Sequence, residues 1–219
     1  MQQCPLPTDQ TGALLMTKKL PEKIAETSVP VAALIAARWS PRAIAPDQPV
    51  SKKQTTALLE AARWAPSCFG DQPWRVIVFD QSTDKEAWTK AFDCLAEGNQ
   101  VWVKNAPVIL AVVASSKFQH NAKPNRWAQY DTGAAAENLC LEATNQNLVA
   151  HQMGGFDGKA LAASFSIPDD FTPMAMVAIG HPGTDGDLPE DLKEREQQPR
   201  ERLDLGKIAF AGNWEQAWE

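Results

Sequence analysis

Two short segments place arginines at alternate positions, a spacing that suits the binding of an anion. Arg38, Ser40 and Arg42 stand in the sequence RWSPR, and Arg200 and Arg202 stand in RER near the C-terminal end. In an extended turn, residues two apart point to the same side of the backbone. A guanidinium offers a planar fork of donors to phosphate oxygens, and its permanent charge can stabilise negative charge on a bound ring. Taken singly, each segment is better explained as solvated surface arginines.

Two loops offer polar groups to a flat ligand. In residues 65–74, prolines near both ends fix the path, Gly70 permits an unusual backbone angle, and Ser67 and Gln72 supply hydrogen bonds. A ligand with several ring heteroatoms needs such a set. In residues 153–158, MGGFDG, the glycines let backbone N–H groups approach a ligand where a helix begins. Each loop is also explained as a tight turn held by its own side chains.

Other chemistries have no support in the motifs. The sequence contains no G-x-G-x-x-G, G-x-x-x-x-G-K-[ST] or G-x-S-x-G and no catalytic-cysteine signature. The histidines His120, His151 and His181 lie about thirty residues apart without carboxylates at ligand spacing, so no metal site is expected. His151 stands beside the second loop, where it could meet a substrate, although a structural role is the better explanation.

Composition describes an acidic globular chain. Its 219 residues include 21 Lys and Arg against 27 Asp and Glu, a formal charge of −6, and 44% are hydrophobic. The acidic balance argues against binding nucleic acid or an anionic membrane. No apolar run approaches the roughly 18 residues of a membrane span, and no secretory signal is evident. The four cysteines are scattered without a C-x-x-C pair, which fits reduced thiols. We therefore expect a cytoplasmic protein whose ligand is small.

Helices and buried strands must position these loops. Ser51 can cap a helix that ends before Pro66, Asp157 can cap a short helix to about Phe165, and 183–198 is a solvated helix or linker. The hydrophobic pattern predicts further helices and three fully buried strands. The helices are expected over 31–38, 84–96 and 127–148, and the strands over 74–79, 108–115 and 174–180.

One domain accounts for this pattern. Residues 1–28 are a loose, polar lead-in, and residues 29–219 form a single α+β or mixed three-layer domain. Its arm, about 200–219, carries apolar side chains that need cover, either from its own domain or from a partner subunit. These are Leu203, Leu205, Ile208, Phe210, Trp214 and Trp218.

In their order and separations, these segments resemble the FMN-dependent nitroreductase family. The resemblance runs from about residue 31 to the end of the chain. The shared motifs are RWSPR at 38–42, AARWAPSCFGDQPWR at 61–75, NAPVIL at 105–110, DTGAAAENL at 131–139, MGGFD at 153–157, AIGHP at 178–182 and RERL at 200–203.

The resemblance implies an α+β nitroreductase-like fold with a central mixed or antiparallel sheet flanked by helices. It also implies an intertwined homodimer with FMN at each end of the interface and the C-terminal arm around the partner. Members pass a hydride from NADH or NADPH to FMN, and then reduce a nitroaromatic, a quinone or a related electrophile in the same cleft by a ping-pong route. The flavin N5 carries the hydride, so no dedicated catalytic residue is expected.

Roles carry over by motif. The resemblance implies that Arg38, Trp39 and Ser40 hold the ribityl-phosphate end with Arg200 and Arg202, and that Arg42 stabilises the reduced ring. It implies contacts from the partner chain by Pro66, Ser67 and Cys68, with Gln72 fixing their loop, and contacts near N5 by Met153, Gly154 and Gly155.

One departure bears on the reaction. Many members have Asn where Gly70 stands, so the flavin contacts of this loop differ here. Two alternatives stay open: an FMN enzyme of the same fold that desaturates a metabolite or reductively removes a substituent, and a flavin-binding protein without turnover.

Overall fold

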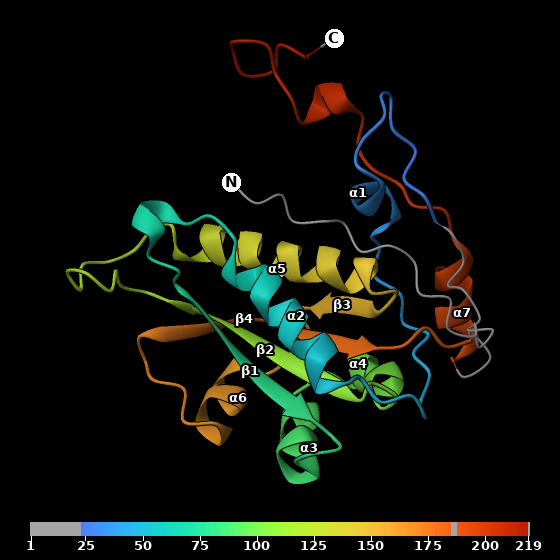
Figure 1. The fold of residues 1–219 in the computed structure, drawn as a ribbon. Helices are drawn as coiled ribbons and strands as arrows, with labels where there is room; N and C mark the ends of the chain where they lie inside the picture. Colours follow the sequence, from blue (N-terminus) through green and yellow to red (C-terminus); the bar gives the residue numbers. More distant parts are fainter. Residues whose placement is uncertain (1–22, 185–187, 219) are drawn as a thin grey trace, which may run out of the picture.

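A four-stranded antiparallel sheet lies at the centre of the computed structural model, which describes residues 23–184 and 188–218 (Figure 1). The strands are β1 (Trp74–Asp80), β2 (Val108–Ser115), β3 (Val149–Met153) and β4 (Phe171–Gly180), in the order β1-β2-β4-β3. All three pairings are antiparallel. Helices cover both faces, so the expected three-layer α+β architecture is confirmed.

The strands differ in burial according to their place in the sheet. Every residue of β2 is buried, because β2 lies between β1 and β4 and under helices on both faces. The expectation of full burial is wrong for β1, an edge strand on which Arg75 and Val78 are exposed, and for the first half of β4. The pairing of β2 with β4 shifts register between Val112 and Val113. Opposite Val113, β4 carries Pro173, which lacks the N–H that a regular ladder needs.

Helices α2 (Lys52–Arg63) and α5 (Ala128–Asn145) cover one face of the sheet. Leu58 of α2 and Leu139 of α5 are fully buried in a shared apolar cluster with β2 and β4. The predicted cap of α2 is confirmed, because Ser51 and Gln54 form a reciprocal capping box. The predicted central helix ends three residues early, at Asn145, and the chain turns at Asn147 (φ 54°) into β3, a strand that we did not predict.

Helices α3 (Lys85–Asp93), α4 (Glu97–Val103) and α6 (Gly158–Ser164) pack on the other face, around a second apolar cluster. The prediction of a single helix over 84–96 is wrong at its C-terminal end, because α3 ends at Asp93. Cys94 caps α3, and Ala96 then donates its N–H to the Gly155 carbonyl (3.0 Å), so the chain leaves the helix before α4. Asp157 caps α6 as predicted.

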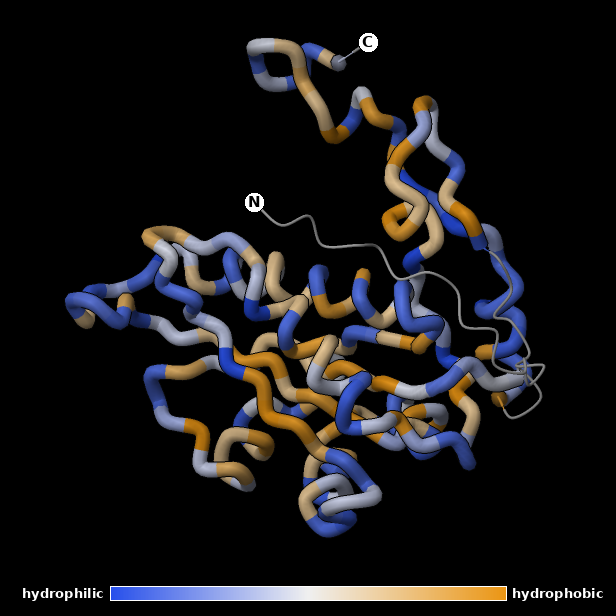
Figure 2. The backbone as a smooth tube through the Cα atoms, viewed as in Figure 1, coloured by the Kyte–Doolittle hydropathy of each residue, from blue (hydrophilic) through white to orange (hydrophobic). Residues whose placement is uncertain are grey.

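Helix α1 (Ala33–Ala37) lies outside these layers and buries none of its residues, whereas α7 (Glu190–Gln197) buries Leu192 in the second apolar cluster. The C-terminal arm contains a short 3-10 turn, Leu205–Lys207, and projects away from the sheet (Figure 1). The backbone of the arm includes hydrophobic segments that lie outside the core (Figure 2). Exposed apolar side chains of the arm are Leu203, Leu205, Ile208, Trp214 and Trp218.

Most of the predicted lead-in, residues 1–22, lies outside the described residues. The remainder is attached to the domain, because Ala25 donates its N–H to the carbonyl of Ala36 (2.9 Å). None of the helices described is both long and apolar enough to cross a membrane.

Candidate functional site

The RWSPR segment leaves α1 in an extended conformation and is held from three elements. Arg38, at the end of α1, pairs with Glu137 of α5 (Nε to Oε1, 3.2 Å). His151 of β3 bonds to the carbonyl of Pro41 (2.9 Å), and because a carbonyl can only accept, Nδ1 of His151 is the donor. On the far side, α7 bonds to Arg42. The position of this segment therefore depends on contacts with helices and a strand distant in sequence.

Three guanidiniums gather at this segment. Arg200 donates to the carbonyls of Lys23 (2.8 Å) and Ala36 (2.6 Å), which fastens the arm to α1. Burial lowers the pKa of Arg200, and the nearby charges of Arg38 and Arg202 lower it further. The predicted grouping of Arg38 with Arg200 and Arg202 is thus present within one chain, and its positive charge suits an anion.

Glu196 of α7 is a site residue that the sequence did not reveal. Glu196 is only 3% exposed. Its Oε1 accepts the backbone N–H of Arg42 (2.9 Å) and lies 3.6 Å from the Arg42 guanidinium. Burial raises the pKa of Glu196, whereas the hydrogen bond and charge of Arg42 lower it. The polar pattern of α7 predicts a solvated helix, and nothing in that pattern distinguishes Glu196 from the neighbouring carboxylates.

His151 has a structural environment. Its ring packs against Trp102 with centroids 4.6 Å apart. Burial lowers the pKa of His151 to about 4, and the hydrogen bond to Pro41 opposes that shift without cancelling it. His151 is therefore neutral near pH 7 and holds the RWSPR segment through its Nδ1–H.

The loop after α2 is stabilised by its own polar groups and by α5. Ser67 Oγ accepts the N–H of Gln72 (2.9 Å), and Asp131, buried at the start of α5, accepts the N–H of Cys68 (3.0 Å). The chain enters the left-handed region at Phe69 (φ 55°) and Gln72 (φ 49°), an uncommon conformation for residues other than glycine. These hydrogen bonds offset the strain and give the loop a defined shape.

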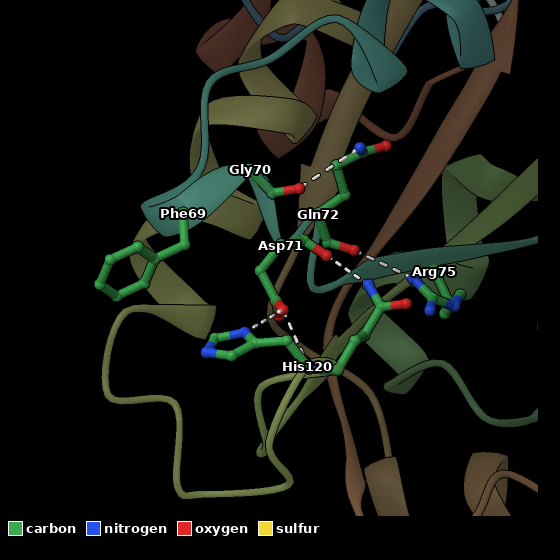
Figure 3. A pocket seen from close by; sticks show the side chains of 7 residues that line it. Phe69, Gly70, Asp71, Gln72, Arg75 and His120 are labelled. Carbon is green, nitrogen blue, oxygen red and sulfur yellow. Dashed lines mark hydrogen bonds and ion pairs between the residues drawn. The ribbon is translucent and has the colours of Figure 1, made fainter.

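Asp71, which follows Gly70, serves a neighbouring loop. Its side chain is 2% exposed, and its Oδ1 accepts the N–H of Gln119 (2.9 Å), while Oδ2 lies 3.5 Å from the Asn125 amide. The Gln119 amide also donates to the Asp71 carbonyl. Asp71 therefore joins this loop to the connection between β2 and α5 (Figure 3), a link between distant segments that no motif in the sequence indicates.

The glycine loop after β3 presents backbone atoms on the surface. Gly154 is exposed, and a Cβ there would meet no atom within 4 Å. A Cβ on Gly155 would lie 2.8 Å from the Asn99 amide, which donates to the Gly155 carbonyl (2.9 Å). The Met153 side chain is buried in the core, so only its backbone can reach a ligand.

Most of the chain matches a known protein family. Residues 35–181 match the Nitroreductase family. The chain belongs to the nitroreductase family. An uncharacterised protein of Mycolicibacterium smegmatis is 38% identical over 129 residues, which cover 59% of this chain and 85% of that protein. A protein of Streptomyces griseus, provisionally named an NADH dehydrogenase/NAD(P)H nitroreductase, is 26% identical over 65% of this chain and 81% of its own length.

Solved nitroreductase-family structures share the fold. A structure described as an oxidoreductase containing FMN has a TM-score of 0.81 and 37% identity, covering 91% of this chain and 98% of its own. A provisional nitroreductase from Desulfovibrio desulfuricans, solved in complex with FMN, has a TM-score of 0.65 and 25% identity, covering 86% of this chain and 99% of its own.

Within a single chain, the predicted site residues lie in separate groups. Arg38, Arg200 and Arg202 are together, and Trp39 lies beside them under the Lys23 ammonium (4.6 Å). The loop at 66–72 is held instead at the start of α5, and Figure 1 shows it far from α1. A single chain thus does not bring Ser67, Cys68 and Gln72 to the arginines.

Proposed function

We propose that this nitroreductase-family chain is an FMN-dependent oxidoreductase that accepts a hydride from NADH or NADPH and reduces a nitroaromatic, a quinone or a related electrophile. The cluster of Arg38, Arg200 and Arg202 carries the proposal, because it concentrates positive charge where the doubly charged phosphate of FMN can bind. Two solved relatives, described as containing FMN and as an FMN complex, support the choice of cofactor. The name of the Streptomyces relative supports the nicotinamide donor.

The residues present fit this cofactor. When bound, FMN supplies the hydride chemistry between donor and acceptor. Arg38, Arg200 and Arg202, with Ser40, would hold its phosphate end. Arg42, restrained by Glu196, would stabilise negative charge on the ring. The exposed Gly154 leaves room for a ring to approach the backbone.

The working unit that we propose is a homodimer in the cytoplasm. Pro66, Ser67, Cys68 and Gln72 would then complete the site of the partner, which accounts for their distance from the arginines of their own chain. The arm would cover apolar surface on the partner, because Trp214 is 81% exposed and Leu203 64% exposed on a single chain. The scattered cysteines, without a C-x-x-C pair, support the cytoplasmic location.

The visible spectrum of the purified protein, recorded without oxygen, tests this function. We expect flavin bands that bleach on addition of NADH or NADPH and return when para-nitrobenzoate or a quinone is added. A protein that binds no FMN after incubation with excess cofactor would contradict the proposal. Bands that neither nicotinamide bleaches would favour a same-fold FMN enzyme with a different reaction.

A further inference from the structure

Asn99 of α4 reaches the glycine loop that follows β3. Its side-chain amide donates to the Gly155 carbonyl (2.9 Å), and the N–H of Ala96, just before α4, donates to the same oxygen (3.0 Å). A carbonyl oxygen has two lone pairs, so these two donors satisfy it. The bond from Ala96 uses a backbone group that nearly any residue would supply, whereas the other bond depends on the side chain at position 99.

The two donors hold one end of a tight turn centred on Gly155. The N–H of Phe156 donates to the Gly154 carbonyl (3.2 Å), a bond between residues i and i+2 that is typical of a γ-turn. The peptide bonds here are trans, so each N–H points away from the C=O of its own peptide unit. The Gly155 N–H therefore points away from this bond, and it has no hydrogen-bond acceptor among the described residues. Because Gly155 is exposed, that N–H is available to a ligand.

The fit between Asn99 and Gly155 explains why position 155 needs glycine. A Cβ on Gly155 would lie 2.8 Å from Asn99 Nδ2 and 3.6 Å from the Cβ of Ala96, so a side chain there would point toward α4. The Asn99 amide would have to move, and its bond to the Gly155 carbonyl would break. A Cβ on Gly154, by contrast, would meet no atom within 4 Å. Gly155 is therefore matched to Asn99, whereas Gly154 is not restricted in this way.

Helix α4 is itself held firmly. The Gln100 side chain donates to the Leu95 carbonyl (3.0 Å), which fixes the turn between α3 and α4. Trp102, three residues after Asn99, is 1% exposed, and its ring packs on His151, which holds the RWSPR segment. One short helix thus restrains both the glycine loop and the arginine segment.

We propose that Asn99 is a positioning residue for the flavin, because it fixes the turn at Gly155 so that the N–H of that residue meets N5 of the ring. The inference rests on the proposed function, since it takes FMN as the ligand. Asn99 does not touch the ring and acts through the Gly155 carbonyl. A glycine turn has many accessible backbone conformations, and an N–H that is already fixed in direction binds an acceptor at a smaller cost in conformational entropy.

Competition between FMN and 5-deaza-FMN tests this role. The analogue has a C–H group in place of N5, so it keeps the phosphate and the ring shape but cannot accept a hydrogen bond at that position. The full-length protein is equilibrated with an equal mixture of both flavins in excess, and the bound flavins are then separated and quantified. We expect the wild type to prefer FMN by about 2- to 12-fold, the range for one hydrogen bond between neutral groups. Poorer folding or weaker phosphate contacts would affect both flavins alike.

Three variants distinguish the Asn99 bond from the general stability of α4. Asn99→Ala should bring the binding of the two flavins toward equality. Asn99→Asp should do the same, because a carboxylate keeps the shape of the side chain but has no N–H to donate. Gln100→Ala is the matched control: it removes an amide-to-carbonyl bond of the same helix that does not reach the glycine loop, and the preference for FMN should persist.

Gly155→Ala tests the same contact from the other side. Its methyl group should displace the Asn99 amide and lower the preference for FMN. In an Asn99→Ala background the same change should lower the preference little further, because the contact is already absent. Non-additive effects of this kind are expected for two residues in direct contact.

The proposal is overturned if the wild type does not prefer FMN, if folded Asn99→Ala and Asn99→Asp keep the preference, or if Gln100→Ala loses it to the same extent. It is equally overturned if Gly155→Ala lowers the preference by the same factor in both backgrounds. A protein that binds neither flavin would contradict this role and the proposed function together.

The two proposals can also fail separately. If a nicotinamide bleaches the bound FMN but Asn99→Ala keeps the preference, the oxidoreductase proposal stands and the role of Asn99 is lost. If Asn99 controls the preference but neither nicotinamide bleaches the flavin, the role of Asn99 stands and the proposed hydride donor is lost.

Discussion

Arg38, Arg200 and Arg202 lie close enough to repel one another, although Arg200 donates to two carbonyls and Arg38 pairs with Glu137. Carbonyl oxygens carry only partial charge, and Glu137 is half-exposed, so these partners do not neutralise the cluster. A bound phosphate would relieve the repulsion. The segment therefore keeps an excess of positive charge.

Arg38→Ala is expected to weaken FMN binding by removing a charge-assisted phosphate contact of about 1.5–3 kcal/mol, or roughly 10- to 150-fold in Kd. Titrating FMN into apoprotein and following flavin fluorescence measures the change. Arg63→Ala is the matched control, because Arg63 pairs with Glu60 (2.6 Å) on the solvent-exposed side of α2. An unchanged Kd for Arg38→Ala would remove Arg38 from the phosphate site.

His151 predicts a pH dependence of stability. Its pKa falls from 6.5 to about 4 on folding, so the unfolded chain binds a proton that the native state excludes. The native state is therefore destabilised as the pH falls from about 6.5 to about 4, by about 3 kcal/mol in total. Above pH 6.5 this effect vanishes.

Urea unfolding across this pH range measures the effect, with His151→Phe as the comparison. The phenyl ring can retain the packing on Trp102 but neither titrates nor donates to Pro41. The variant should be less stable near pH 7 and should show a shallower loss toward pH 4. Equal slopes for the two proteins would mean that His151 already titrates normally in the native state. Glu196, whose pKa burial raises, acts in the opposite direction at low pH.

At the scale of elements, α7 controls the RWSPR segment through a buried carboxylate. Glu196→Gln keeps an oxygen for the Arg42 N–H but removes the charge beside its guanidinium. Freed from this counter-charge, Arg42 should favour reduced, anionic flavin more strongly. We expect the ratio of reduced to oxidised flavin at a fixed potential to rise about tenfold, equivalent to about 30 mV for two electrons. Equilibration with a reference dye measures the potential, and no positive shift would exclude this coupling.

Packing between α2 and α5 makes a separate prediction. Leu139 on α5 is 0% exposed and lies in the cluster that joins both helices to the sheet. Leu139→Ala should lower the free energy of unfolding by about 2–5 kcal/mol, because it removes buried methyl groups and leaves a cavity. Urea denaturation at fixed protein concentration measures it, and Leu141→Ala, at a partly exposed position of the same helix, should cost less. Equal losses would contradict this view of the core.

At the scale of the whole molecule, the arm is the part that a single chain leaves without cover. Truncation after Arg202 keeps the arginine cluster and removes the exposed apolar residues. If the arm covers the partner, the truncated chain should sediment as a monomer or dissociate at higher concentration than the full chain. Sedimentation velocity over a dilution series measures this. A truncated chain that stays as dimeric as the full one would assign the interface to the sheet and helices alone.

Much of the fold follows from local sequence. The apolar run of β2, the cap residues Ser51 and Asp157 and the long central helix were predictable because each depends on neighbours a few residues away. β3 was not, since five residues, VAHQM, are too few and too polar to distinguish a strand from the end of a helix. The break between α3 and α4 depends on a bond from Ala96 to Gly155, far along the chain.

By itself, the sequence determined the resemblance to the nitroreductase family, which the family match confirms, and it supplied the candidate residues for binding an anion or a flat ring. Only the tertiary structure decided their partners. It buries Glu196 against Arg42, and it forms the hydrogen bonds of His151 with Pro41 and of Asp71 with Gln119. It also separated the 66–72 loop from the arginines. Side-chain chemistry and helix caps are local properties, whereas burial and pairing arise from contacts between residues distant in sequence.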